Sequence, residues 1–199
     1  APLREAIEYE WVQFPDDFVP DQYSGYPTQE SEDEWAKLWD FGEINVPYEN
    51  LHLLNKSTDM PWQRTDPDEG GGVVGFLEVF HVIHCLDMVR QFIYRDEYDY
   101  SANPLFDAPD HVVWRHVDHC INTIRISLQC TSDVTPYLQF LAPEKPAGLD
   151  ADFRTLHTCR NFDKIRDWNR EHKTTLHIPE GHEHPFHKDM DLEQYQHSS

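Results

Sequence analysis

The sequence predicts a mainly α-helical fold: a compact helical core built on two helices, with long irregular arms and a few short strands. Residues 73–96 and 111–129 carry apolar side chains at the 3.6-residue period of a helix. Proline and glycine clusters interrupt the chain around both segments, which is typical of irregular connections. The length of 199 residues favours a single domain, which we place at residues 1–180, followed by a polar, His-rich tail at residues 181–199.

The remaining elements follow from local patterns, taken in chain order. Residues 1–30 are rich in proline and aromatic side chains and predict an extended arm. A capping box that starts at Ser31 predicts a helix over residues 31–41. Beyond the two long helices, we expect a short strand over residues 137–141 and a last short helix over residues 162–172.

The charge balance excludes several classes of function. The chain has 37 Asp and Glu against 16 Lys and Arg, a formal net charge of −21. Such a polyanion repels phosphate backbones and anionic lipids, so we expect neither a nucleic-acid partner nor a peripheral membrane role. No apolar run approaches the roughly 20 residues that span a bilayer. The 11 Phe, 9 Tyr and 6 Trp supply large side chains for a folded core.

Three features of the chain predict a secretory compartment. The sequence begins at Ala1 rather than Met, which we attribute to a removed signal peptide or membrane anchor, trimming being the simpler explanation. The four cysteines form an even set, as expected for two disulfides in an oxidising lumen. Asn55-Lys56-Ser57 is a glycosylation sequon. We therefore expect a glycoprotein of the secretory lumen.

The most informative feature is an internal repeat of five residues. The segment His81–Cys85 (HVIHC) recurs as His116–Cys120 (HVDHC). Positions i and i+3 of a helix project from one face, so each copy forms a clamp of two imidazoles. Imidazole suits copper, zinc, iron and nickel, and neither copy contains the embedded Glu of a zinc hydrolase motif. We therefore predict metal binding by His81, His84, His116 and His119.

The cysteines allow two interpretations. As thiolates, Cys85 and Cys120 would complete two sites of two histidines and one cysteine. As disulfides they would lock the helices together; Cys120 and Cys130 lie about 15 Å apart along one helix, too far to bridge. Two pairings remain: Cys85–Cys120 with Cys130–Cys159, or Cys85–Cys130 with Cys120–Cys159. The symmetry of the repeats favours the first pairing, and the predicted compartment favours disulfides over thiolate ligands.

These segments resemble the UstYa-like oxidase family of fungal natural-product gene clusters. The resemblance covers roughly residues 25–169 and includes the segments Gly25–Thr28, Cys130–Pro136 and His157–Ile165 beside both HxxHC motifs. Members of the family typically carry an N-terminal transmembrane helix that places the domain in a secretory compartment. The resemblance therefore implies a membrane-anchored protein whose anchor precedes Ala1.

The resemblance also implies a reaction and a cofactor. It implies oxidation of a peptide or small secondary metabolite by hydroxylation, chlorination, oxidative cyclisation or desaturation, with O2 as co-substrate and chloride where chlorination occurs. It implies two copper ions, each held by the two histidines of one motif. Because conventional dinuclear copper proteins offer three imidazoles per ion, each copper would keep an open position for O2, water, chloride or substrate. His157, ranked above His111, is the alternative further ligand.

Smaller signals complete the set of candidate residues. Asp133 lies just past the second long helix, where its carboxylate would either orient a ligand histidine or, more simply, cap the helix end. Arg90 and Arg125 follow their motifs at the same distance, and we expect both to form ion pairs in this acidic chain. The tail histidines have metal-like spacing, but we assign them to adventitious binding; they are His182, His184 and His187.

The leading hypothesis from the sequence is a copper-dependent oxidase or oxygenase that functionalises C–H bonds of a natural product. A non-catalytic, zinc-stabilised interaction module is the alternative from another class. A copper carrier is a third possibility, which predicts labile Cu(I) and no product.

Overall fold

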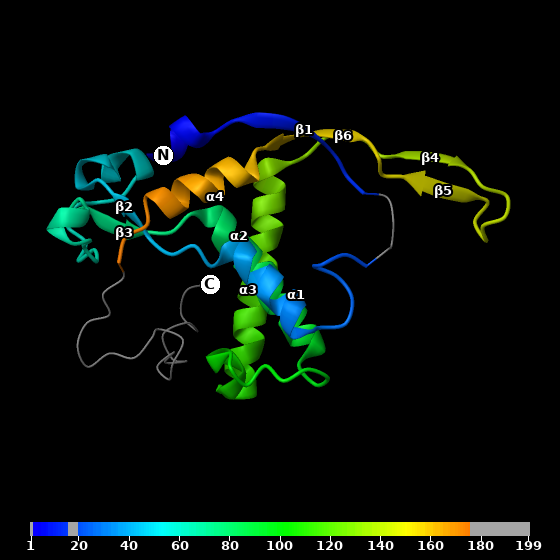
Figure 1. Cartoon of the computed structure of the whole chain (residues 1–199), viewed down its shortest axis with the longest axis horizontal. Coiled ribbons are helices and arrows are strands. Elements are labelled where there is room, and N and C mark those ends of the chain that lie inside the picture. Colours follow the sequence, from blue (N-terminus) through cyan, green and yellow to red (C-terminus); the bar gives the residue numbers. More distant parts are fainter. Residues whose placement is uncertain (1, 16–19, 176–199) are drawn as a thin grey trace.

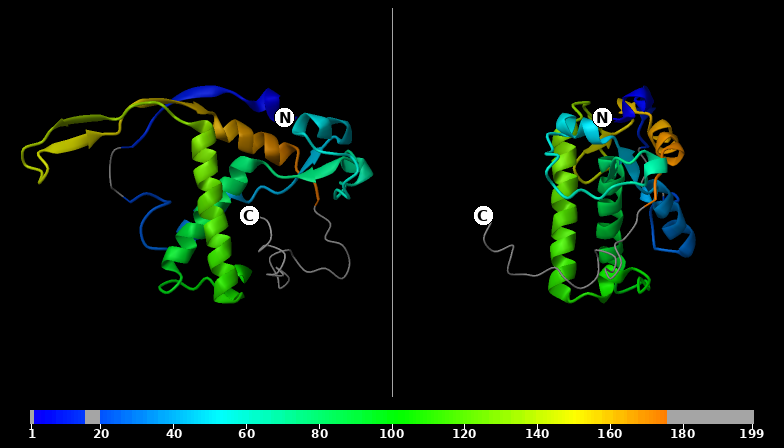
Figure 2. Two further views of the ribbon diagram at one scale, coloured as in Figure 1. Left: turned by 180° about the vertical axis from the view of Figure 1, so that it is seen from behind. Right: turned by 90° about the vertical axis from the view of Figure 1, so that its left-hand side faces the viewer.

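The fold is centred on two long antiparallel helices. The computed structural model describes residues 2–15 and 20–175, so the predicted His-rich tail lies outside the described residues (Figure 1). Helix α2 spans Glu78–Tyr94 and helix α3 spans Asp110–Thr131, joined by a loop that contains the 3-10 helix η4, Pro104–Asp107. Figure 2 shows that α2 and α3 pack against each other and cross at an angle.

Two shorter helices lie against this pair. Helix α1, Gln29–Trp39, packs on α2, and helix α4, Phe162–Glu171, lies near the start of α2 (Figure 1). The capping box of α1 is shifted from the expected place, because Thr28 is the N-cap and Ser31 is the third helical residue. The aromatic side chains of Phe80 and Phe162 join α2 to α4 within a small apolar cluster.

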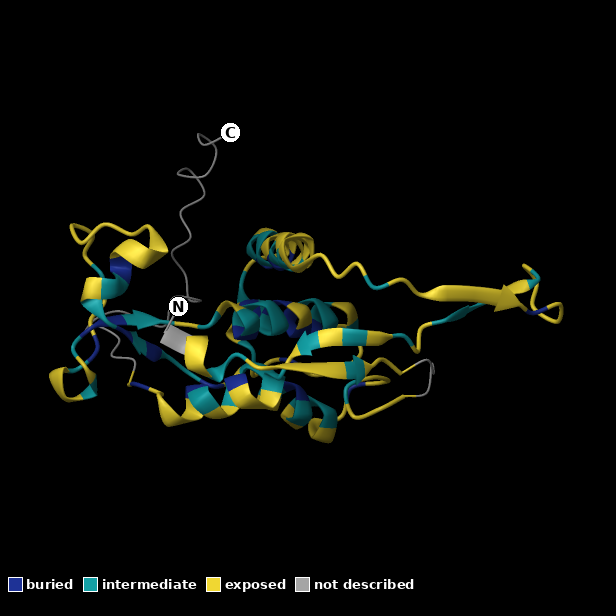
Figure 3. Ribbon diagram, turned by 90° about the horizontal axis from the view of Figure 1, so that it is seen from above, coloured by how far each residue is buried: buried dark blue, intermediate teal, exposed yellow. Residues whose placement is uncertain are grey.

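The strands form three separate two-stranded antiparallel sheets among the described residues. Strand β1, Tyr9–Gln13, pairs with β6, Leu156–Arg160, and so joins the N-terminal segment to the C-terminal part of the domain. Strand β2, Ile44–Val46, pairs with β3, Val73–Gly75. Strand β4, Leu138–Leu141, pairs with β5, Leu149–Asp152, in a hairpin that projects away from the helices (Figures 1 and 3). Further 3-10 helices are η1 at Pro2–Ala6, η2 at Tyr48–Leu54 and η3 at Pro67–Glu69.

The predicted mainly α fold with a compact helical core is wrong. Helices make up 46% of the described residues and strands 15%, so the fold is mixed α/β with small sheets. The apolar interior is also divided into three small clusters: one between α2 and α4, one around β2 and β3, and one between α2 and α3. A pair of helices with few covering elements cannot enclose one continuous core, and the short strands bury the remaining apolar side chains locally.

Part of the predicted first long helix is a strand. The apolar period suggested a helix from residue 73, but β3 occupies Val73–Gly75 and α2 begins only at Glu78. The glycines before β3 explain the difference. A Cβ atom on Gly72 would lie 2.3 Å from the carbonyl oxygen of Val46, so only glycine permits this close pairing of β3 with β2.

Candidate metal centre

The two HxxHC motifs face each other across the interface of α2 and α3. Because the helices are antiparallel, the first histidine of one motif lies opposite the second histidine of the other. The ring centroids of His81 and His119 are 5.8 Å apart, and His84 and His116 line one pocket together. Each pairing therefore takes one histidine from each helix.

The first group of donors consists of His81, Cys85 and His119. One ligand atom from each of these residues lies within 4.8 Å of the others, which is the spacing of a metal site. Cys85 is buried, and a hydrogen bond from the Cys120 thiol lowers the pKa of Cys85 to about 7. The same contact raises the pKa of Cys120. Of these two cysteines, Cys85 is therefore the one that more readily loses its proton and can bind a metal as a thiolate.

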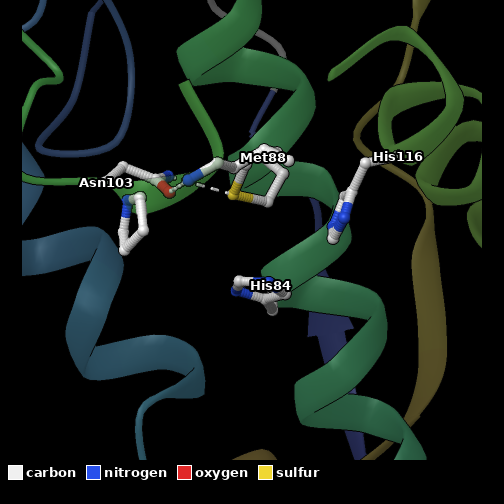
Figure 4. Close-up of a pocket in the computed structure, with 6 residues that line it drawn as sticks. His84, Met88, Asn103 and His116 are labelled. Carbon is white, nitrogen blue, oxygen red and sulfur yellow. Dashed lines mark hydrogen bonds between the residues drawn. The ribbon is translucent and has the colours of Figure 1, made fainter. Parts of the chain in front are cut away.

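The second group contains His84 and His116. Both line a partly open pocket together with Met88, Asn103, Pro104 and Leu105 (Figure 4). Burial is the main cause that lowers the pKa of both imidazoles, and the charge of neighbouring histidines lowers it further. Both side chains therefore remain neutral near pH 7. Nδ1 of His84 is buried without a hydrogen-bond partner. A neutral imidazole with an unsatisfied buried nitrogen is the form that binds a metal ion.

The two copies of the motif are equivalent beyond the five repeated residues. Arg90 donates through Nε to Oδ1 of Asp87 at 2.9 Å, and Arg125 donates through Nε to Oδ1 of Asn122 at 3.0 Å. These contacts occupy matching positions of the two helices. The antiparallel packing and the matched contacts together describe an approximate twofold relation, and Cys85 contacts its counterpart Cys120 across it.

A buried polar network supports the first motif from helix α1. Trp39 donates through Nε1 to Oδ2 of Asp87 at 3.0 Å, and the Trp39 ring meets the ring of His84 edge-on at 4.5 Å. Arg90 binds Asp87 and also both carboxylate oxygens of Glu32, at 2.8 and 2.6 Å. Burial raises the pKa of Asp87, an effect that Arg90 opposes. The network therefore fixes the position of Trp39 against His84.

Sequence reasoning missed the contacts of Asp87 and Trp39. The available signal was an acidic side chain among the apolar positions of an amphipathic helix: Asp87 is only 2% exposed. A buried carboxylate requires a cationic or hydrogen-bonding partner. The predicted ion pairs of Arg90 are confirmed. Arg125 instead donates to the amide oxygens of Asn122 and Gln129.

Comparison with known proteins identifies the family. The family model described as "Mycotoxin biosynthesis protein UstYa" matches residues 1–172. The chain belongs to the UstYa family. The resemblance recognised from the motifs is thereby confirmed. No solved structure matches this UstYa-family chain.

Curated relatives share most of this chain. It is 46% identical to the UstYa family oxidase phomYc of Diaporthe leptostromiformis, over 75% of this chain and 58% of the relative. Two proteins of Talaromyces islandicus are similar as well. They are the transacylase cctO, 34% identical over 86% of this chain and 59% of the relative, and the hydroxylase cctR, 26% identical over 74% and 51%. The chain thus spans somewhat more than half the length of these relatives.

The other candidate ligands of this UstYa-family domain are not part of the group of His81, Cys85 and His119. His157, on β6, stacks on Phe14 with ring centroids 3.8 Å apart, and its Nδ1 lies 2.6 Å from Oδ2 of Asp133. Hydrogen bonds from Thr135 are the main cause that lowers the pKa of Asp133 to about 2, and the hydrogen bond with His157 adds to this effect. Asp133 therefore accepts a hydrogen bond in the turn after α3 and also contacts the His157 ring. Whether His157 is a metal ligand, as the first interpretation requires, stays a prediction. His111 is exposed near the start of α3.

The predicted disulfides are not formed in this structure of the UstYa-family domain. All four cysteines are free. Cys85 and Cys120 are buried together and share a hydrogen bond, whereas Cys130 is exposed at the end of α3 and Cys159 is half-buried on β6. The sequence analysis favoured disulfides and kept thiolate ligands as the alternative. For Cys85, which lies with His81 and His119, the structure agrees with that alternative.

The grouping of the histidines also differs from what the family resemblance implied. The resemblance assigned one copper to each motif, whereas the structure combines His81 with His119 from the other helix. An antiparallel crossing at the motifs explains the difference, because it brings the start of one motif to the end of the other.

Proposed function

We propose that this domain is a copper-dependent oxidase that functionalises C–H bonds of a fungal secondary metabolite or peptide with O2. The observation that carries the proposal is the convergence of two histidine groups, each drawn from both helices, beside a pocket. The names of relatives, an oxidase at 46% identity and a hydroxylase at 26%, support an oxidative role. Hydroxylation is the reaction that we favour, with chlorination, cyclisation and desaturation as the other outcomes of product analysis.

The donor atoms fit copper. His81, Cys85 and His119 would hold one ion, and His84 with His116 would hold a second; imidazole and thiolate are both ligands that copper accepts. When bound, copper supplies the one-electron chemistry with O2 that no amino-acid side chain provides. The lowered pKa of His84 and of His116 favours the neutral imidazole, in which one ring nitrogen carries no proton and is available to the metal.

The pocket beside His84 and His116 would hold the reacting part of the substrate. Its other walls are Met88, Asn103, Pro104 and Leu105, and its volume is about 50 Å³. Ligand pockets usually measure about 300–1,000 Å³, so this one admits one group of a larger substrate rather than a whole natural product. Apolar walls next to the histidines would exclude water from a C–H bond placed there.

We further propose that the protein works in the secretory lumen, anchored through a segment that precedes Ala1. The exposed sequon residue Asn55, in a left-handed turn after η2, supports glycosylation at this position. Among the described residues, none of the helices has the length and apolar character of a membrane span. We propose a small-molecule or peptide substrate and no nucleic-acid partner, as the net charge of −21 supports.

A zinc-stabilised module is the second candidate, because one cysteine and two histidines also suit structural zinc. Elemental analysis of protein purified from a secretory host distinguishes the two. We expect copper, up to two ions per chain, with Cu(II) signals in electron paramagnetic resonance. Zinc in place of copper would contradict the proposal. Incubation of the copper-loaded protein with a candidate metabolite, O2 and a reductant, with and without chloride, then identifies the product by mass. Labile Cu(I) without any product would indicate a carrier.

A further inference from the structure

We propose that Met88 is a third donor to the metal held by His84 and His116, so that the two metal positions are chemically different. One position has a thiol among its donors and the other has a thioether. The inference rests on the proposed copper function and adds to it a residue that lies outside both HxxHC motifs.

The position of Met88 on the helix makes the contact possible. Met88 lies four residues after His84 on α2, and side chains with this spacing lie above one another on the same helix face. Met88 is 3% exposed and lines the same pocket as His84 and His116. Figure 4 shows its side chain beside these two histidines.

The sulfur of Met88 is held by a chain of hydrogen bonds. The side-chain amide of Asn103 lies 3.3 Å from Sδ and donates also to Oε1 of Gln91 at 2.8 Å. Gln91 in turn donates to Asp87, the residue that positions Trp39 against His84. A methionine that only filled space in the core would need no polar partner. The thioether has a second lone pair, which remains available to a metal in the pocket.

The equivalent position of the second motif carries a different residue. Thr123 follows His119 by the same four residues, and its Oγ1 lies 3.5 Å from Nε2 of His119. The approximate twofold relation therefore places a thioether next to one histidine pair and a hydroxyl next to the other. Thioethers are soft donors that favour Cu(I), whereas hydroxyl groups do not. We infer that Met88 strengthens Cu(I) binding by His84 and His116 compared with the same position without the thioether.

X-ray absorption on selenomethionine-labelled protein tests this inference directly. The chain contains three methionines, Met60, Met88 and Met190. In the Cu(I)-loaded protein, the copper edge should show a selenium neighbour at bonding distance, and the selenium edge should show copper. Met88→Leu should abolish both signals. Met60→Leu, a change at an exposed site, and Met190→Leu should leave them unchanged.

Titration against a chromogenic Cu(I) chelator gives a second readout. Leucine nearly conserves the volume of methionine, so Met88→Leu should fold with an almost unchanged melting temperature. We expect it to weaken binding of one of the two Cu(I) ions by about tenfold or more, a loss typical of changes around a metal site. The Met60→Leu variant should bind both ions as the unsubstituted protein does.

The possible results separate this inference from the proposed function. Two bound copper ions without a selenium neighbour would overturn the role of Met88 and leave the copper function intact. A selenium signal that survives Met88→Leu would overturn the assignment as well. A protein that retains no copper would overturn the proposed function itself.

Discussion

Asp87 and Asn122 occupy equivalent positions in the two copies of the repeat but lie in different surroundings. Asp87 is buried and joins Arg90 to Trp39, and Arg90 in turn joins it to Glu32 of α1. Asn122 is exposed, and its side-chain oxygen accepts hydrogen bonds from Arg125. The same local contact is therefore part of a buried network in α2, whereas in α3 it lies on the protein surface.

This difference yields a prediction with an internal control. Asp87→Ala should lower the free energy of unfolding by about 3–5 kcal/mol, because it leaves a largely buried Arg90 without one of its partners. Asn122→Ala should change it by less than about 0.5 kcal/mol, as surface substitutions usually do. Urea denaturation of the metal-free proteins measures both values. Similar losses in the two variants would show that the network around Asp87 does not stabilise the domain.

Residue-level patterns predicted the donors better than their grouping. The spacing of His81 and His84, and its repetition, predicted which faces of the two helices carry the candidate donors, and the structure brings these faces together. The direction in which α3 crosses α2 is a tertiary property that depends on the loop 95–109, and no pattern within either motif encodes it. The contact between Asp133 and His157 was likewise only partly foreseen, because it joins the end of one helix to a distant strand.

At the scale of the elements, the antiparallel helix pair determines which histidines lie together and would share a metal in the proposed site. The structure groups residues across the helices, and this grouping predicts the behaviour of double variants. His81→Ala combined with His119→Ala should remove about one copper per chain and leave the ion at His84 and His116. His81→Ala combined with His84→Ala should weaken both positions, because each loses one imidazole.

Copper content after dialysis measures the difference, and circular dichroism verifies that the helices persist. If each motif instead held its own copper, the outcomes would be exchanged. The pair of substitutions within one motif would then remove a single ion cleanly, and the pair across the helices would damage both positions.

The elements themselves were predicted unequally. The helices α3 and α4 and the strand β4 lie close to the segments that periodicity predicted, because each repeats its pattern over enough residues or ends at a clear proline. Strands β2 and β3 have three residues each, too few to show a period, and β3 continued the apolar pattern of α2. Pairing between β1 and β6 joins opposite ends of the chain, which local patterns do not report.

At the scale of the whole molecule, the domain combines a helical centre with a projecting hairpin. Figure 3 shows β4 and β5 extending away from the helices, and all four residues of β4 are exposed. The candidate donors grouped in the structure lie on α2 and α3, and none of them lies on the hairpin. The apolar interior is divided into small clusters, so each part of the domain is stabilised locally rather than by one common core. The loss of the hairpin should therefore affect the helices little.

The hairpin should therefore be dispensable for metal binding. Leu138 and Asp152 are partners across the two strands, so their backbones are close enough for an Asn-Gly turn to replace residues 139–151. Tyr137 and Phe153, whose rings are 5.1 Å apart, remain to hold the shortened ends together. We expect the same copper content and a melting temperature within a few degrees of the unaltered protein, since β4 packs on nothing but β5 among the elements in extensive contact. Calorimetry and elemental analysis of the shortened protein test this. Loss of a copper ion would mean that the hairpin, despite its distance in the structure, contributes to the metal centre.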